Sequence, residues 1–180
     1  MHNITCHTAP VPDEAAPAPP RCGKLDMRIA RDGKWYYQGS VIPRKEMVCL
    51  FSSMLTRRAD GAYWLETPME QCEIEVEDVP FVAVELFTCC SSGQRCYSFR
   101  TNVDEMVTLD AQHPLRIVDG GSGGAPPYLT VRPGLEARLA RSVYYELVAL
   151  GNEEVIGGET LYGIWSKGIF FPLGKLDELV

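Results

Sequence analysis

The chain has 180 residues, of which 46% are hydrophobic and 23% are charged, and its formal net charge is -7. This composition predicts a globular protein with a packed core, and the length suits one large domain or two small ones. The acidic balance argues against a general nucleic-acid-binding protein, which would carry a basic excess or a basic stripe.

Residues 1–24 differ from the rest of the chain because they are rich in Pro and Ala. We expect a disordered N-terminal arm there. The arm has neither the basic start nor the apolar stretch of a secretory signal, and no run of 18 apolar residues occurs in the chain. The sequence therefore predicts a cytoplasmic protein that does not insert into a membrane.

Residues 25–70 are expected to form an N-terminal half. Asp32–Gly33, between "MRIA" and "KWYYQ", favours a β-hairpin. After Pro43, apolar side chains recur every three or four residues, which predicts a helix with one buried face. That face would consist of Met47, Leu50, Phe51, Met54 and Leu55, with Arg57 and Arg58 at the end of the helix. A strand, "AYWLETP", should follow.

Residues 71–180 are expected to form a C-terminal half. It begins with a meander of "EIEV", "FVAVELF" and "RCYSFRTN", and two short strands follow. "GGSGGAPP" predicts a flexible loop. After the strand "YLTV", Pro133 is predicted to open a second helix that runs to about Leu150. "LYGIW" and "IFFPL" should form a closing hairpin.

Two internal echoes suggest a duplication. "YYQGSVIP", a helix and "AYWL" match "YLTVRP", a helix and "LYGIW" in order. Separately, "GKWYYQG" has the glycine and aromatic spacing of "GIFFPLG". The two echoes imply different alignments, so at most one of them reflects a duplication.

Several stretches resemble a known family: "RIARDGKWYYQGSVIPRKEMVCLF", "GAYWLETPME", "IEVEDVPFVAVE", "FRTNVDE", "HPLRI", "PYLTVRPGLEARLARSVYYELV" and "IWSKGIFFPLG". In this order they are similar to a proteobacterial domain-of-unknown-function family of short, single-module proteins. The resemblance implies an α+β fold of two related halves, each with curved, mainly antiparallel strands around one helix. It implies a pleckstrin-homology-like C-terminal half, no established enzymatic activity, and a cleft between the halves for a nucleotide-like signalling ligand.

Arginines suggest an anion site. On the predicted second helix, Arg138, Arg141 and Tyr145 would share one face. Guanidinium groups match phosphate and carboxylate, so these residues are candidates for an anionic subsite. The other interpretation is a structural network, in which Arg138 and Arg141 pair with acidic side chains. The predicted subsite comprises Arg100, Thr101, Asn102, Arg132, Arg138, Arg141 and Tyr145.

The aromatic run at residues 35–37 has two interpretations. In a strand, Trp35 and Tyr37 share one face and Tyr36 the other, and one face must pack on the neighbouring helix. The remaining aromatic side chain either fills the core or lines the interface between the halves. Trp165 has the same two interpretations, so Trp35 and Trp165 complete the list of ligand-binding candidates.

The seven cysteines are an odd number without a C-x-x-C pair, and in a cytoplasm we expect reduced thiols and no structural disulfide. Cys89, Cys90 and Cys96 surround a predicted turn, where they are either ordinary exposed thiols or peroxide-sensing ones. Glu73, Glu75 and Glu77 alternate with apolar residues, which is typical of a solvated strand face. No catalytic residue, metal site or cofactor is predicted.

The leading hypothesis is a non-enzymatic ligand-sensing or adaptor protein that binds a nucleotide-like anion between its halves and takes part in signal transduction with a protein partner. The first alternative is a protein-interaction module whose partner docks on the acidic sheet edge. An enzyme acting on a nucleotide-like substrate is the third hypothesis. The sequence predicts no oligomeric state.

Overall fold

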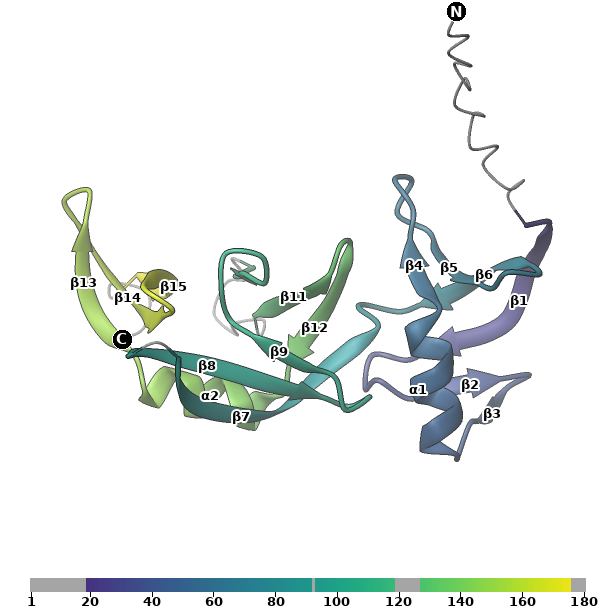
Figure 1. Cartoon of the computed structure of the whole chain (residues 1–180), viewed down its shortest axis with the longest axis horizontal. Helices are drawn as coiled ribbons and strands as arrows, with labels where there is room; N and C mark the ends of the chain where they lie inside the picture. The colour runs from purple at the N-terminus through teal and green to yellow at the C-terminus, as the bar shows by residue number, and fades with distance from the viewer. Residues whose placement is uncertain (1–18, 92, 119–126, 176–180) are drawn as a thin grey trace, which may run out of the picture.

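The computed structural model describes residues 19–91, 93–118 and 127–175. These residues form two curled six-stranded sheets, a three-stranded sheet and two helices (Figure 1). The predicted α+β fold of two related halves is therefore confirmed. The pleckstrin-homology-like character of the C-terminal half stays a prediction. No helix among the described residues is long and apolar enough to cross a membrane.

The first sheet belongs to the N-terminal half, and its strands follow the order β3-β2-β1-β6-β5-β4. The elements are β1 (Arg21–Ile29), β2 (Trp35–Tyr37), β3 (Ser40–Val41), α1 (Lys45–Ser53), β4 (Leu55–Arg57), β5 (Tyr63–Glu66) and β6 (Gln71–Val76). The predicted hairpin is present: β1 and β2 are antiparallel neighbours, and the turn places Gly33 at φ 82°. At the centre of the sheet, β1 and β6 are parallel.

The second sheet has the order β10-β11-β12-β7-β8-β9. Its elements are β7 (Phe81–Ser91), β8 (Gln94–Thr101), β9 (Met106–Thr108), β10 (Leu115–Arg116), β11 (Tyr128–Arg132) and β12 (Leu135–Leu139). Again the central pair, β12 and β7, is parallel. The helix α2 (Arg141–Ala149) follows β12, and the small third sheet consists of β13 (Asn152–Ile156), β14 (Glu159–Ser166) and β15 (Ile169–Lys175).

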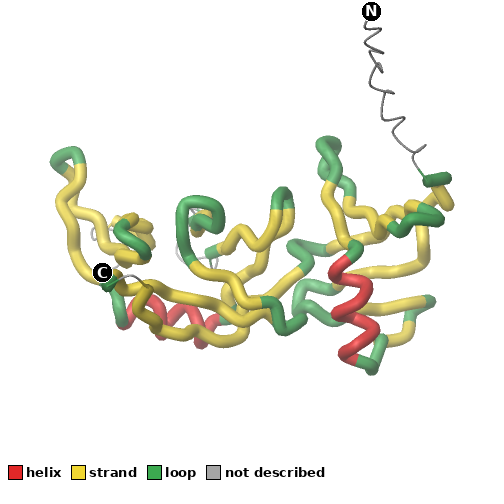
Figure 2. The backbone as a smooth tube through the Cα atoms, viewed as in Figure 1, coloured by secondary structure: helices red, strands yellow, loops and turns green. Residues whose placement is uncertain are grey.

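Both six-stranded sheets trace the same path. The chain runs from the centre to one edge through three strands, and then from the opposite edge back to the centre through three more. The helices break this symmetry (Figure 2). Along the chain, α1 connects the edge strands β3 and β4 of the first sheet, whereas α2 follows β12, the last strand of the second sheet. Neither sequence echo matches this duplication: the first equates β2 with β11 and the second equates β2 with β15, while the equivalent of β2 is β8.

The predicted second helix is wrong over its first half. Gly134, at φ 75°, closes a tight turn after Pro133, and residues 135–139 return as β12. Along β12 the side chains of Leu135, Ala137 and Leu139 are buried while the two between them are half-buried. This alternation has the period of a strand, and sequence reasoning overlooked it because the residues themselves favour helices.

The first helix is shorter than predicted and presents another face. It ends at Ser53, and Leu55 is buried in β4 instead. Leu50 is 59% exposed, although it was predicted to be buried. The inward face carries Ser52, which is buried, and Phe51, whose ring stacks at 6.3 Å from that of Trp35. Pairing of residues 55–57 with β5 ends the helix before its apolar pattern ends.

The boundary between the halves also differs from the predicted one at residue 70. β6 pairs with β1 and β5, so the N-terminal sheet extends to Val76 and the chain crosses to the second sheet over residues 77–80. The predicted arm overlaps β1 at residues 21–24. Residues 1–18 of the arm, and residues 120–126 of the predicted glycine-rich loop, lie outside the described residues.

The prediction that all thiols are reduced is wrong for the structure. Cys22 pairs with Cys72, and Cys89 pairs with Cys96, across Cα distances of 5.2 and 5.1 Å that suit disulfides. Cys89 and Cys96 lie directly opposite one another on β7 and β8. An odd cysteine count does not reveal such pairs, because they depend on strand register. Cys49 and Cys90 are free.

Asn102 fastens the two halves together. Its amide nitrogen donates to the carbonyl of Gly33 at 3.0 Å, and its amide oxygen accepts from the backbone N–H of Val82 at 2.9 Å. Nearby, the Cys49 thiol donates to the carbonyl of Val103 at 3.3 Å. One cluster of buried apolar side chains runs through both sheets. The halves thus share a core and a polar seam.

We predict that Asn102→Ala lowers the free energy of unfolding by about 1–3 kcal/mol, because it leaves two backbone groups unpaired. Asn152, exposed at the start of β13, is the matched control, and Asn152→Ala should change stability by less than about 0.5 kcal/mol. Urea denaturation measures both. Equal effects of the two substitutions would contradict the role of Asn102.

The third sheet is attached to the second through Ser166 and Asp110. The Ser166 hydroxyl donates to the carbonyl of Leu109 at 2.6 Å and accepts from the N–H of Tyr97 at 3.2 Å. Lys167 and His113 each lie 3.0 Å from the Asp110 carboxylate. Desolvation would raise the pKa of Asp110, but hydrogen bonds from Lys167, His113 and two backbone N–H groups outweigh it and lower the pKa from 3.8 to about 2.

A lowered carboxyl pKa contributes stability above its unfolded value, and this contribution is lost as the pH falls through the folded value. We therefore expect wild type to be more stable than Asp110→Asn at pH 5, and the difference to shrink between about pH 4 and pH 2. Urea denaturation across this range measures the difference. A difference that stays constant with pH would show that Asp110 does not stabilise the fold through its charge.

Candidate functional site

The structure does not bring the predicted arginines together on one face. Arg138 lies on β12, where it donates to the carbonyl of Arg31 at 2.7 Å and approaches Asp78 at 3.6 Å. Arg132, on β11, donates to the carbonyl of Ser52 at 2.9 Å and lies 3.3 Å from Glu105. Both side chains therefore join the second sheet to the first half. The pair between Arg138 and Asp78 is of the kind that the structural-network interpretation expects.

The other candidates are dispersed. Arg100 pairs with Glu85 and Asp104, whose hydrogen bonds raise its pKa, and Thr101 is buried, accepting from the N–H of Glu105. Trp35 is a core residue, 1% exposed. Trp165 is exposed and donates to Glu154. Arg141 and Tyr145 are exposed on α2.

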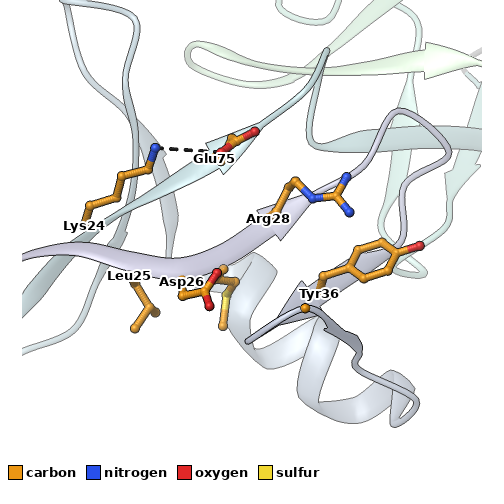
Figure 3. Close-up of a pocket in the computed structure, with 8 residues that line it drawn as sticks. Lys24, Leu25, Asp26, Arg28, Tyr36 and Glu75 are labelled. Atoms are coloured by element: carbon orange, nitrogen blue, oxygen red, sulfur yellow. Dashed lines mark ion pairs between the residues drawn. The ribbon is translucent and has the colours of Figure 1, made fainter.

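One hollow of about 480 Å³ lies against β1 (Figure 3). It forms where the β1–β6 register slips between Lys24 and Arg28. Figure 3 shows Lys24 reaching toward Glu75, at 3.7 Å, while Leu25 and Asp26 point to the other side of β1. The Arg28 guanidinium lies over the ring of Tyr36 and pairs with Glu77. Both cations of this hollow thus have carboxylate partners.

A second hollow, of about 390 Å³, lies between the halves, and we refer to it as the groove. One wall comes from β4 of the first sheet, and the other comes from β10, β11 and β12 of the second sheet. In Figure 1 the β4–β5 hairpin stands next to the β11–β12 hairpin. The groove is lined by Arg57, Arg116, Thr130, Gly134, Leu135 and Glu136. A Cβ atom on Gly134 would lie 3.3 Å from that of Arg57, so the turn and the arginine are in close contact.

Each half supplies an arginine that lies over a tyrosine ring. Arg57 is directly opposite Tyr63 in the β4–β5 register, and its guanidinium is 5.2 Å from the ring centroid. Arg116 is directly opposite Tyr128 in the β10–β11 register, at 4.4 Å. β4 and β10 occupy equivalent places in the two sheets, as do β5 and β11. The duplicated fold thus repeats the same arginine–tyrosine pair on both sides of the groove.

The two tyrosine rings that pack against these arginines are uncharged. Burial raises the pKa of Tyr63, with Arg57 opposing the shift. Burial also raises the pKa of Tyr128, and so does its hydrogen bond to Asp78, at 3.1 Å. The face of an uncharged phenol ring attracts a guanidinium group but does not accept its hydrogen bonds, so the N–H groups of the arginine stay available to other acceptors.

The two arginines differ in their partners. Arg116 donates through Nε and Nη2 to the two oxygens of Glu136 at 2.8 and 2.6 Å, which fixes its plane and raises its pKa. Its side chain is still 50% exposed. Arg57 donates only to the carbonyl of Gly61, at 3.3 Å, and has no carboxylate partner within the described part of the chain. The groove therefore combines a fixed guanidinium with one that is free to bind an anion.

Comparison with known proteins places the chain in a family. Residues 12–79 match the family model described as "Domain of unknown function (DUF1285), N-terminal domain", and residues 80–173 match the DUF1285 C-terminal domain. The chain belongs to the DUF1285 family. The expected family resemblance is confirmed, and the division between the DUF1285 domains coincides with the passage from β6 to β7.

Two solved structures of DUF1285 proteins are similar to this chain. The protein from Silicibacter pomeroyi is 42% identical, with a TM-score of 0.78 over 89% of this chain and 86% of that one. The protein from Shewanella baltica is 25% identical, with a TM-score of 0.56 over 69% of this chain and 91% of that one. The search of curated proteins finds no match.

Sequence reasoning missed both arginines of the groove. Arg57 was assigned to the end of a helix, and Arg116, in "LRIVD", was not considered. The sequence does contain one signal, because a short strand with an arginine precedes a tyrosine-bearing strand in both halves. The contact between arginine and tyrosine, however, depends on the register of both hairpins, which the residues do not specify.

Proposed function

We propose that this DUF1285 protein is a non-enzymatic ligand-sensing module of the cytoplasm that binds a nucleotide-like anion in the groove between its halves and acts in signal transduction. The observation that carries this proposal is the pair of arginines, one from each half, of which Arg57 lacks a carboxylate partner within the described residues.

The groove has the size and the chemistry for such a ligand. Its volume of about 390 Å³ lies in the range of small-molecule sites. A phosphate or carboxylate group would take up the free N–H groups of Arg57 and Arg116. The Thr130 side chain on the groove wall offers a hydroxyl to a neighbouring oxygen of the ligand. Glu136 would repel a second negative group placed close to it, which favours one anionic group at this end.

A sensing role is supported by the fact that the two arginines belong to different halves of the protein. An anion held by Arg57 and Arg116 would bridge the first sheet and the second, because each arginine is fixed to its own sheet by a tyrosine. Such a ligand stabilises the arrangement in which both arginines face the groove. A signalling partner that recognises this arrangement would then respond to the ligand.

Docking of a protein on the acidic strand receives less support. Glu75 pairs with Lys24, Glu77 with Arg28, and Asp78 with Arg138, so cations of the chain itself already neutralise these carboxylates. A basic partner would have to displace the existing pairs.

We predict that at least one anion from a panel of nucleoside mono- and triphosphates, cyclic dinucleotides and inorganic phosphate raises the Tm of the wild-type protein. Bound ligand stabilises by mass action, by about 2.7 kcal/mol at 100 times Kd. Arg57→Ala should abolish this shift while lowering the stability of the free protein by less than about 1 kcal/mol, because Arg57 is exposed. Added salt should weaken binding.

Arg141→Ala is the matched control, because Arg141 is an exposed arginine outside the groove. It should leave the ligand-induced shift unchanged. The proposal fails if no anion of the panel shifts the wild type, or if Arg141→Ala removes the shift and Arg57→Ala does not. Turnover of a bound nucleotide would instead favour the enzyme hypothesis.

A further inference from the structure

We propose that Cys22, Cys72 and Glu70 form a three-ligand site for a thiophilic divalent cation of the zinc class when the Cys22–Cys72 disulfide is reduced. The two sulfur atoms and a carboxylate oxygen of Glu70 all lie within 4.8 Å of one another. The site lies on the central β1–β6 pair of the first sheet, whereas the groove lies at the β4 edge, and it is independent of the anion proposal.

Strand pairing brings the three ligands together. Cys22 is on β1 and Cys72 on β6, and these parallel strands are hydrogen-bonded neighbours. Glu70 precedes β6 in a turn closed by Thr67, whose hydroxyl accepts from the Glu70 N–H at 3.0 Å and donates to its carbonyl at 3.0 Å. The N–H of Gln71 donates to the carbonyl of Pro20, also at 3.0 Å, which joins the two strands beside the site.

The ligand set selects the class of metal. Two thiolates suit zinc, cobalt or cadmium, whereas calcium and magnesium require oxygen ligands. Two sulfur atoms on a tetrahedral zinc lie about 3.8 Å apart, given a bond of about 2.3 Å, so the two cysteine side chains must rotate apart after reduction. Their Cα atoms are 5.2 Å apart, which leaves room for this rotation. Cys72 is buried, while Cys22 and Glu70 are exposed, so a cation can enter from one side. Three protein ligands leave a fourth position for water.

The site exists only in the reduced protein. A dithiol reductant gives two electrons and two protons to the Cys22–Cys72 disulfide, which becomes two thiols while the reductant becomes a disulfide. The cation then displaces the two thiol protons into solvent and binds two thiolates and the Glu70 carboxylate. Disulfide formation and metal binding therefore exclude each other.

The test uses Co²⁺ with the full-length protein, reduced with dithiothreitol and freed of it without oxygen. We expect one equivalent to bind with a thiolate-to-cobalt charge-transfer band. Cys22→Ser should reduce the band and weaken binding by more than about tenfold, and Glu70→Gln should keep the band but weaken binding by at least about tenfold. Oxidised protein should not show the band.

Two control variants test three of the other cysteines. The double variant Cys89→Ser/Cys96→Ser removes the other pair, and Cys6→Ser removes a thiol outside the described residues. Both should keep the band and the affinity. The proposal is overturned if reduced wild type binds Co²⁺ no better than oxidised protein, or if Cys22→Ser leaves the intensity of the band and the affinity unchanged. Unchanged affinity in Glu70→Gln overturns the three-ligand site. Circular dichroism checks that Cys22→Ser, at an exposed position, is folded.

Discussion

The carboxylate of Asp78 lies where the chain crosses from the first sheet to the second, and it is held from both sides. Tyr128 donates to it at 3.1 Å, Arg138 approaches it at 3.6 Å, and Arg31 approaches it at 3.9 Å. A half-buried carboxylate requires such partners. The contact fixes the crossing segment and also the phenol on which Arg116 rests. Both the relation of the halves and one wall of the groove therefore depend on this carboxylate.

The duplication of the sheet explains why the same arginine–tyrosine pair occurs on both sides of the groove, although the two arginines have different partners. Equivalent edge strands contribute Arg57 and Arg116, each over a tyrosine of the adjacent strand. The sequences have diverged next to these pairs, because Glu136 neutralises Arg116 whereas Arg57 has only a carbonyl partner within the described residues. Two equivalent cations with different partners give a site that has one fixed and one available donor group.

The sequence was informative where local chemistry decides the structure. The turn at Asp32–Gly33 follows from residues close in the chain, and the α+β class with two related halves follows from the family resemblance. Register and tertiary pairing decided the rest. β12 replaced half of a predicted helix because Gly134 turns the chain, and the pairing of Cys89 with Cys96 needs the alignment of β7 with β8. Arg138 and Arg132 were predicted to belong to an anionic subsite, and the structure instead shows them donating to backbone carbonyls of the first half.

β6 links the two proposed sites. Glu70 precedes this strand, Cys72 is its second residue, and the chain continues from its end to Asp78, which binds Tyr128 beneath Arg116. A cation or a disulfide at its start would fix β6 to β1, and the backbone of Glu77 is already fixed to Ile29 at its end, at 3.0 Å. Because β6 is anchored at both ends, a change at the cysteines has little freedom to displace Asp78. We therefore expect the two sites to be energetically independent, so that loss of Cys22 leaves the anion affinity of the groove unchanged.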